Sequence, residues 1–174
     1  MLFITHAITG ATIGLASGNP ILGFILGFLS HHVLDAIPHF DQGSFYLSRD
    51  FRKPAWLGAE HHENGKKFKV MRDWAILLID MASTSLLSLA LLLGHPPSVW
   101  LLYIVGATGG LMPDILDASP FWKHRFRATK IGKFFHPIHL FFHWPLSSRF
   151  WHIGIATQVL IVFGGLFLML GYLF

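Results

Sequence analysis

The sequence predicts an all-α fold: a polytopic bundle of about five transmembrane helices plus an interfacial helical segment, in a single unit spanning residues 1–174. Composition is the first reason. The chain is 53% hydrophobic and 13% charged, with a mean hydropathy of +0.54, whereas a soluble domain carries about 25% charged residues. The second reason is that residues 1–34, 81–113 and 150–174 contain no lysine, arginine, aspartate or glutamate. About 20 apolar residues suffice for a membrane helix.

The expected helices follow from these uncharged stretches and from the turn residues between them. The first stretch is long enough for two helices, at about 2–17 and 20–37, because Gly-Asn-Pro at residues 18–20 predicts a turn. In residues 121–150, aromatic and basic residues alternate, which favours an interfacial or re-entrant segment. The remaining expected helices lie at about 74–93, 98–112 and 151–174.

The basic residues predict the orientation. All 13 lysines and arginines lie in two segments, 49–72 and 123–149, and basic loops stay cytoplasmic. We therefore expect a multi-pass protein of the inner cell membrane, with its N-terminus in the cytoplasm. Because the positive charge flanks apolar helices, the expected partner is membrane lipid and not nucleic acid. The absence of cysteine excludes disulfides and thiolate metal sites.

Histidines and acids gather on the cytoplasmic side of this topology. Asp35 and Asp80 lie within apolar helices, where a carboxylate costs about 2.5–3.5 kcal/mol, so both should face the bundle interior and have partners there. No lysine or arginine lies within a helix to pair with them. Histidine, a protonated neighbour or a metal ion remains, and imidazoles with carboxylates around a divalent cation are a self-consistent solution.

Spacing brings several of these groups onto shared helix faces. His31 and His32 precede Asp35 by four and three residues, and Asp114 precedes Asp117 by three. We expect a divalent cation, zinc in the first place and manganese or iron as alternatives. The candidate metal ligands are His6, His31, His32, Asp35, His39, Asp114, Asp117 and His136. The candidate catalytic residues are Asp80, His139 and His143, of which Asp80 could also be a ligand or orient one.

Several short motifs resemble one known family. The segment Thr5–Gly10, a helix ending in a His/Asp motif, and Pro113–Asp117 together resemble the membrane-bound metal-dependent hydrolase family of bacterial and archaeal inner membranes. The resemblance implies a multi-helix hydrolase with ligands at one membrane face. The residues that match are His6, His31 or His32, Asp35, and Asp114 with Asp117. The chain departs from the family pattern in its paired histidines with His39, and in the late segment His136–His139.

The expected function is that of a membrane-embedded, metal-dependent hydrolase with its site at the cytoplasmic rim, acting on a phosphoester or a lipid-derived ester. A di-iron membrane oxidase or hydroxylase is one alternative, although His-x-x-His-His boxes are not intact in the sequence. A non-enzymatic carrier or scaffold is the other, and it would place polar groups on both sides of the membrane or along a path through it.

Overall fold

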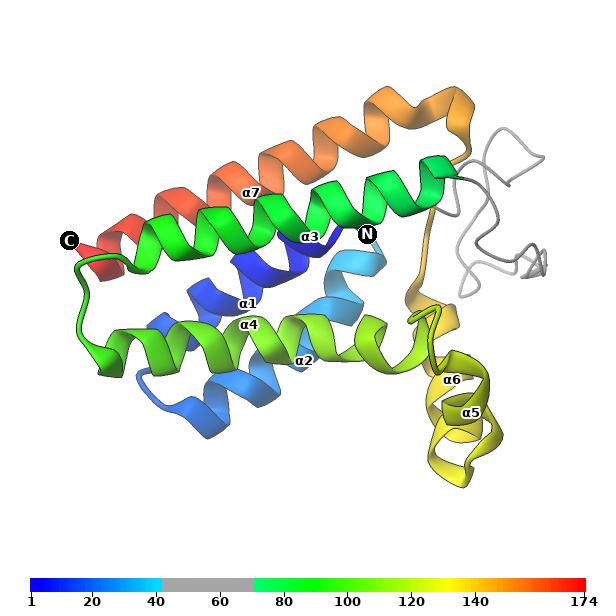
Figure 1. Ribbon diagram of the computed structural model, residues 1–174, viewed down its shortest axis with the longest axis horizontal. Coiled ribbons are helices and arrows are strands. Elements are labelled where there is room, and N and C mark those ends of the chain that lie inside the picture. Colours follow the sequence, from blue (N-terminus) through cyan, green and yellow to red (C-terminus); the bar gives the residue numbers. More distant parts are fainter. Residues whose placement is uncertain (42–70) are drawn as a thin grey trace.

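The computed structural model describes residues 1–41 and 71–174, which form an elongated helical bundle (Figure 1). Most of the basic segment 49–72 therefore lies outside the described residues. The all-helical class predicted from the sequence is confirmed for the described part of the chain. The elements are α1 (Phe3–Ser17), α2 (Pro20–Asp35), α3 (Met71–Leu92), α4 (Pro97–Asp117), α5 (Lys123–Ala128), α6 (Lys130–Phe142), the short 3-10 helix η3 (Ser148–Phe150) and α7 (Trp151–Leu173).

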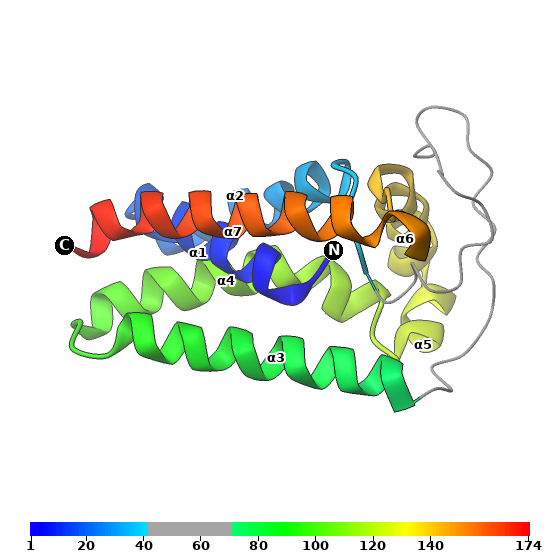
Figure 2. The ribbon, with the colours of Figure 1, turned by 90° about the horizontal axis from the view of Figure 1, so that it is seen from above.

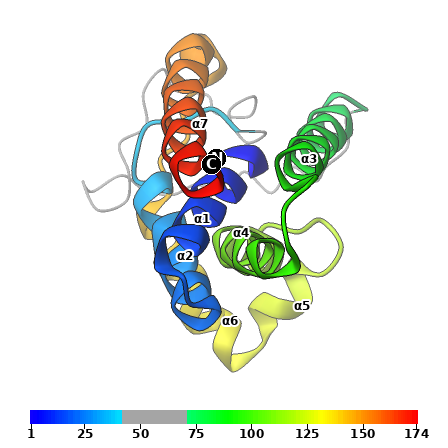
Figure 3. The ribbon, with the colours of Figure 1, turned by 90° about the vertical axis from the view of Figure 1, so that its left-hand side faces the viewer.

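Helix α1 lies at the centre of the bundle, between α2, α4 and α7, as the end-on view shows (Figure 3). It packs on α4 with the two backbones in contact. A Cβ atom at Gly10 would overlap the carbonyl oxygen of Gly106, and one at Gly106 would overlap the carbonyl oxygen of Gly10. Small residues allow this approach in membrane proteins, where close van der Waals packing drives helix association. The contact sets how α1 and α4 are rotated toward each other.

The turn at residues 18–20 lies where the sequence predicts it, and a second turn lies between the expected helices 74–93 and 98–112. Gly18 ends α1 in the left-handed conformation, with φ of 59°, which glycine adopts at little cost. The side chain of Asn19 then accepts hydrogen bonds from the amides of Ile21 and Leu22 at 3.0 and 3.1 Å. Pro20 opens α2 at a position where its missing N–H costs nothing. Gly94, with φ of 87°, is used in the same way between α3 and α4.

Three helices are long and apolar enough to cross a membrane: α3 over Trp74–Leu92, α4 and α7. Helices α1 and α2 are apolar but shorter, at 15 and 16 residues, so the expected number of about five spans is not confirmed. Helix α7 exposes large apolar side chains, such as Leu160 at 72% and Phe167 at 77%. An exposed apolar face of this kind is typical of a surface that contacts lipid or another protein.

One helix end differs from the sequence prediction. Helix α4 was expected to end at about residue 112, yet it continues through Pro113 to Asp117. A proline removes one intrahelical hydrogen bond, and the following turn keeps its own, such as that from the Ala118 amide to the Asp114 carbonyl at 2.9 Å. The segment 121–150 is largely helical, as the sequence predicts: it forms α5 and α6, which lie across one end of the bundle (Figure 1).

Candidate metal centre

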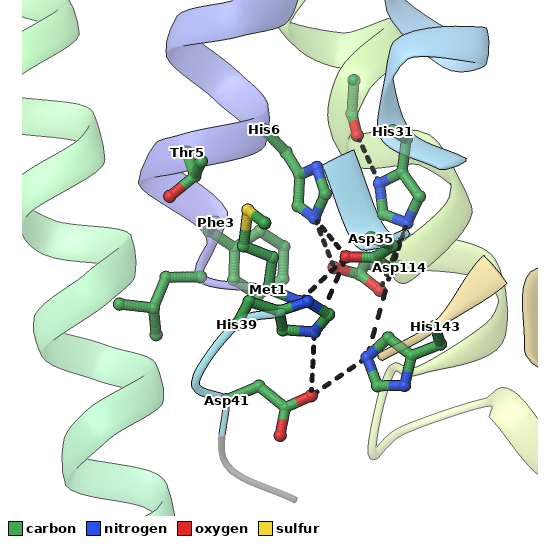
Figure 4. A network of polar contacts seen from close by, with 12 residues as sticks. Met1, Phe3, Thr5, His6, His31, Asp35, His39, Asp41, Asp114 and His143 are labelled. Carbon is green, nitrogen blue, oxygen red and sulfur yellow. Dashed lines mark hydrogen bonds and ion pairs between the residues drawn. The ribbon is translucent and has the colours of Figure 1, made fainter. Parts of the chain in front are cut away.

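A cluster of histidine and aspartate side chains lies at the end of the bundle where α2 and α4 end and α6 passes (Figure 4). Helix α2 contributes His31 and Asp35, which share a face because they are four residues apart. Asp114 comes from the last turn of α4, and His139 comes from α6. All four side chains are buried. Each offers one ligand atom, and these atoms lie within 4.8 Å of one another, so the group could hold a metal ion.

The distances in this group suit a shared cation. The Nε2 atom of His31 lies 3.3 Å from Asp35 Oδ2 and 3.8 Å from Asp114 Oδ1. The Nε2 atom of His139 lies 3.5 Å from each of the same two carboxylates. Ligands about 2.0–2.1 Å from a tetrahedral zinc ion are themselves about 3.4 Å apart. The four side chains therefore already have the separations of ligands around one ion.

Partners behind the two imidazoles turn their lone pairs into the cluster. His31 Nδ1 lies 2.8 Å from the carbonyl oxygen of Gly110, which can only accept, so His31 carries its proton on Nδ1. His139 Nδ1 lies 2.9 Å from Asp117 Oδ2, which acts in the same way. This outer hydrogen bond is the usual way to fix the tautomer of a metal-binding histidine. The two Nε2 atoms then face each other at 3.2 Å. Because two lone pairs at this distance repel each other, a proton or a metal ion between them would stabilise the arrangement.

The carboxylates make this region attractive to positive charge. Burial alone lowers the pKa of His139, but hydrogen bonds to Asp117 and Asp35 and the charge of Asp114 outweigh it and raise that pKa to about 10. Burial also lowers the pKa of the Met1 amino group, but the charges of Asp35, Asp114 and Asp41 outweigh it and raise that pKa to about 10. That amino group lies 3.1 Å from Asp35 Oδ1. Both shifts have the direction expected where carboxylates surround a positively charged group.

His6 faces the same two carboxylates from α1. Its Nε2 atom lies 3.2 Å from Asp35 Oδ1 and 3.9 Å from Asp114 Oδ2. The ring stacks on that of His31, with centroids 3.9 Å apart. Both ring nitrogens are buried without a hydrogen-bond partner, as is Asp35 Oδ2. A buried polar atom without a partner carries a free-energy penalty, and a bound ion would relieve it here.

A second group adjoins the first and shares Asp35 with it. The ligand atoms of Asp35, His39 and His143 also lie within 4.8 Å of one another. His39 follows the end of α2, where its backbone pairs with the segment after α6: its amide donates to the Trp144 carbonyl at 3.2 Å. Asp41 completes this side, with Oδ2 at 3.0 Å from His143 Nε2. Sequence reasoning missed Asp41, although its position two residues after His39 could have suggested it.

Other predicted site residues contact the centre indirectly or lie elsewhere. Asp117 and His136, predicted as ligands, bind each other, with His136 Nδ1 at 2.7 Å from Asp117 Oδ2. Asp117 thus supports His139 from behind. The ring of His32, also predicted as a ligand, packs near Phe28, Phe135 and Phe142. Neither Asp117, His136 nor His32 belongs to the two groups of candidate ligands found among residues 1–41 and 71–174.

Asp80, predicted as a catalytic residue, caps a helix instead of joining the cluster. Its Oδ2 and Oδ1 atoms accept hydrogen bonds from the amides of Phe3 and Ile4 at 2.6 and 3.1 Å. The first amides of a helix have no intrahelical partner and carry partial positive charge. The N-terminus of α1 therefore supplies the partner that the sequence demanded for this buried carboxylate.

Known proteins offer no guide to the role of this cluster. No family model matches the chain, and no curated protein or solved structure matches it either.

Proposed function

We propose that the chain is a membrane-embedded, metal-dependent hydrolase that acts on a phosphoester or a lipid-derived ester. The observation that carries the proposal is the convergence of two imidazoles and two carboxylates, all buried, from three helices: His31, Asp35, Asp114 and His139. Two nitrogen and two oxygen ligands suit zinc first, and manganese or iron as alternatives. A divalent cation bound there would polarise the scissile group and lower the pKa of a bound water toward about 7.

The residues around the four ligands have supporting roles in this proposal. Asp117 and the Gly110 carbonyl keep the Nδ1 protons of the two ligand histidines pointing outward. His6 Nε2, which lies 3.2 and 3.9 Å from the two ligand carboxylates and has no hydrogen bond, is placed to add a third imidazole to the ion.

A largely apolar cavity beside the centre supports a lipid-derived substrate. It has a volume of about 230 Å³ and lies between α3 and α4. Leu77, Met81, Leu111 and Phe121 are among its lining residues, and Asp114 is the one ionisable residue in its wall. The Asp114 side chain keeps 11% exposure. A lipid whose acyl chain fills this cavity would thus present its polar end to a ligand of the metal.

The membrane assignment is part of the same proposal. Helices α3, α4 and α7 would cross the inner membrane, and the cluster would lie at its cytoplasmic side. Helix α6 exposes Ile131 at 72% and Phe134 at 74% next to Lys130 and Lys133. Apolar residues beside basic ones are typical of a helix at the surface of an anionic leaflet. This position would bring anionic lipid headgroups close to the centre.

Metal analysis of the detergent-purified protein tests the proposal. We expect wild type to retain at least one zinc, manganese or iron ion per chain, and Asp35→Asn and Asp114→Asn to lose it, because each removes an anionic ligand. His124→Ala, which changes an exposed histidine of α5 away from the cluster, is the matched control and should retain the ion. Wild type without metal after supplementation with each of the three ions would contradict the proposal. A pair of iron ions with visible charge-transfer absorbance would favour the oxidase alternative.

A further inference from the structure

His39 has the surroundings of a metal ligand but does not belong to the four-residue group. Its ring is fully buried, and its Nδ1 atom lies 2.8 Å from the carbonyl oxygen of Ile37. That carbonyl can only accept, so the proton of His39 is on Nδ1 and the lone pair is on Nε2. The Nε2 atom is buried without a hydrogen-bond partner. Its closest carboxylate oxygens, from Asp41 and Asp35, are 3.7 and 3.8 Å away.

These separations are too long for hydrogen bonds and close to those between ligands of one ion. A hydrogen bond between nitrogen and oxygen is about 2.7–3.2 Å long, whereas two ligands of a tetrahedral zinc ion are about 3.4 Å apart. His143 lies on the same side, with Nε2 at 3.9 Å from Asp35 Oδ2 and at a hydrogen-bonding distance of 3.0 Å from Asp41 Oδ2, a contact that a bound ion would replace. Figure 4 shows His39, Asp41 and His143 on the side of Asp35 opposite His31.

We propose that Asp35, His39, Asp41 and His143 form a second divalent-cation site, and that Asp35 bridges it to the first. The inference rests on the proposed function, because the first ion belongs to that proposal. It reassigns His143, which the sequence suggested as a catalytic residue, to a ligand role.

A bridging carboxylate has a chemical consequence for hydrolysis. Two ions that share one carboxylate can together stabilise the attacking and the leaving oxygen of a phosphoester, as in other two-metal sites. The second site is also the more accessible one, because the side chains of His143 and Asp41 are 22% and 15% exposed, whereas those of His139 and Asp114 in the first group are 7% and 11% exposed. The second ion would therefore exchange more readily than the first.

Manganese binding, followed by metal analysis and electron paramagnetic resonance, tests the second site without an activity assay. Wild type loaded with Mn²⁺ alone should bind two ions per chain and show the signal of a spin-coupled pair. His39→Gln and, separately, His143→Gln should each bind one ion and show an uncoupled signal. His124→Gln should behave like wild type. If the buried His39→Gln variant does not fold, His143→Gln near the surface gives the same readout.

The outcomes separate this inference from the proposed function. Wild type that binds one ion, which both His39→Gln and His143→Gln retain, would overturn the second site and leave the first intact. Two ions without spin coupling would overturn the bridging role of Asp35. Wild type that binds no ion would remove the proposed function together with the inference.

Discussion

Asp117 contacts a candidate metal ligand, His139, without being a candidate ligand itself. Its Oδ2 atom binds the Nδ1 atoms of His136 and His139 at 2.7 and 2.9 Å, and its Oδ1 atom accepts from Arg127 Nε at 2.9 Å. The sequence suggested Asp117 as a ligand because it follows Asp114 by three residues. In the structure Asp117 lies behind the His139 ring, on the side away from the other candidate ligands, and it orients that ring through Nδ1.

This arrangement predicts the effect of Asp117→Asn. The substitution removes the negative charge and leaves a single acceptor oxygen for three donors, so His139 loses its fixed orientation. We expect metal affinity to fall by about 10–100-fold, the usual cost of losing such an outer partner, with the helical content unchanged. Competition with a chromophoric chelator measures the affinity.

The control for Asp117→Asn is His136→Gln. This variant removes a neighbouring ring but keeps the acceptor of His139, so its metal affinity should stay close to that of wild type. An Asp117→Asn protein with wild-type affinity would mean that Asp117 does not orient the ligand.

At the scale of elements, the spacing between α3 and α4 determines the cavity that opens beside the candidate metal ligands. Asp80 ties α3 to the N-terminus of α1, and the cavity between α3 and α4 has Asp114 in its wall. The sequence predicts both helices from their apolar runs. It does not predict the cavity, because the distance between two helices depends on which side chains meet between them.

Met81→Trp tests whether this cavity takes the acyl chain of a substrate. Met81 lines the cavity from α3, and the larger indole would fill it. For a long-chain ester we expect kcat/KM to fall by about tenfold or more, since each methylene group that loses its place in an apolar pocket costs about 1–3 kcal/mol. The short-chain form of the same ester should be hydrolysed at the wild-type rate.

Leu86→Trp is the matched control for this variant, because Leu86 is on α3, is 68% exposed and does not line the cavity. It should leave both substrates unaffected. Equal losses on long-chain and short-chain esters in Met81→Trp would argue against an acyl-chain cavity.

At the scale of the whole molecule, the two ends of the bundle differ in chemistry. The turns after α1 and α3, and the C-terminus, lie at one end, and the metal-ligand groups, α5 and α6 lie at the other (Figures 1 and 2). If the bundle crosses a membrane, these two ends face different compartments. The proposed orientation puts the histidine-rich end in the cytoplasm.

Single cysteines test this orientation, because the chain has no native cysteine. Ala16→Cys and Ser98→Cys place a thiol at the turn end, and His124→Cys places one in α5. In right-side-out vesicles, we expect a membrane-impermeant maleimide to label the first two, and to label His124→Cys only in inverted vesicles. Labelling of Ser98→Cys but not of Ala16→Cys would mean that α1 and α2 do not reach the outer face.

The sequence by itself determined the properties that depend on neighbours along the chain. Its composition determined the helical class, glycine and asparagine determined the turn at residues 18–20, and spacing put His31 and Asp35 on one face of α2. Spacing is sufficient within a helix because the period of 3.6 residues always puts side chains three or four residues apart on the same face.

Only the tertiary structure decided which of these faces meet. The glycine contact between Gly10 and Gly106 sets the rotation of α1 and α4, and the fold of α6 brings His139 between Asp35 and Asp114. The same packing turns His32 toward phenylalanine rings and gives Asp80 the N-terminus of α1 as a partner. These outcomes depend on contacts between residues far apart in the sequence, whose free energies no local pattern encodes.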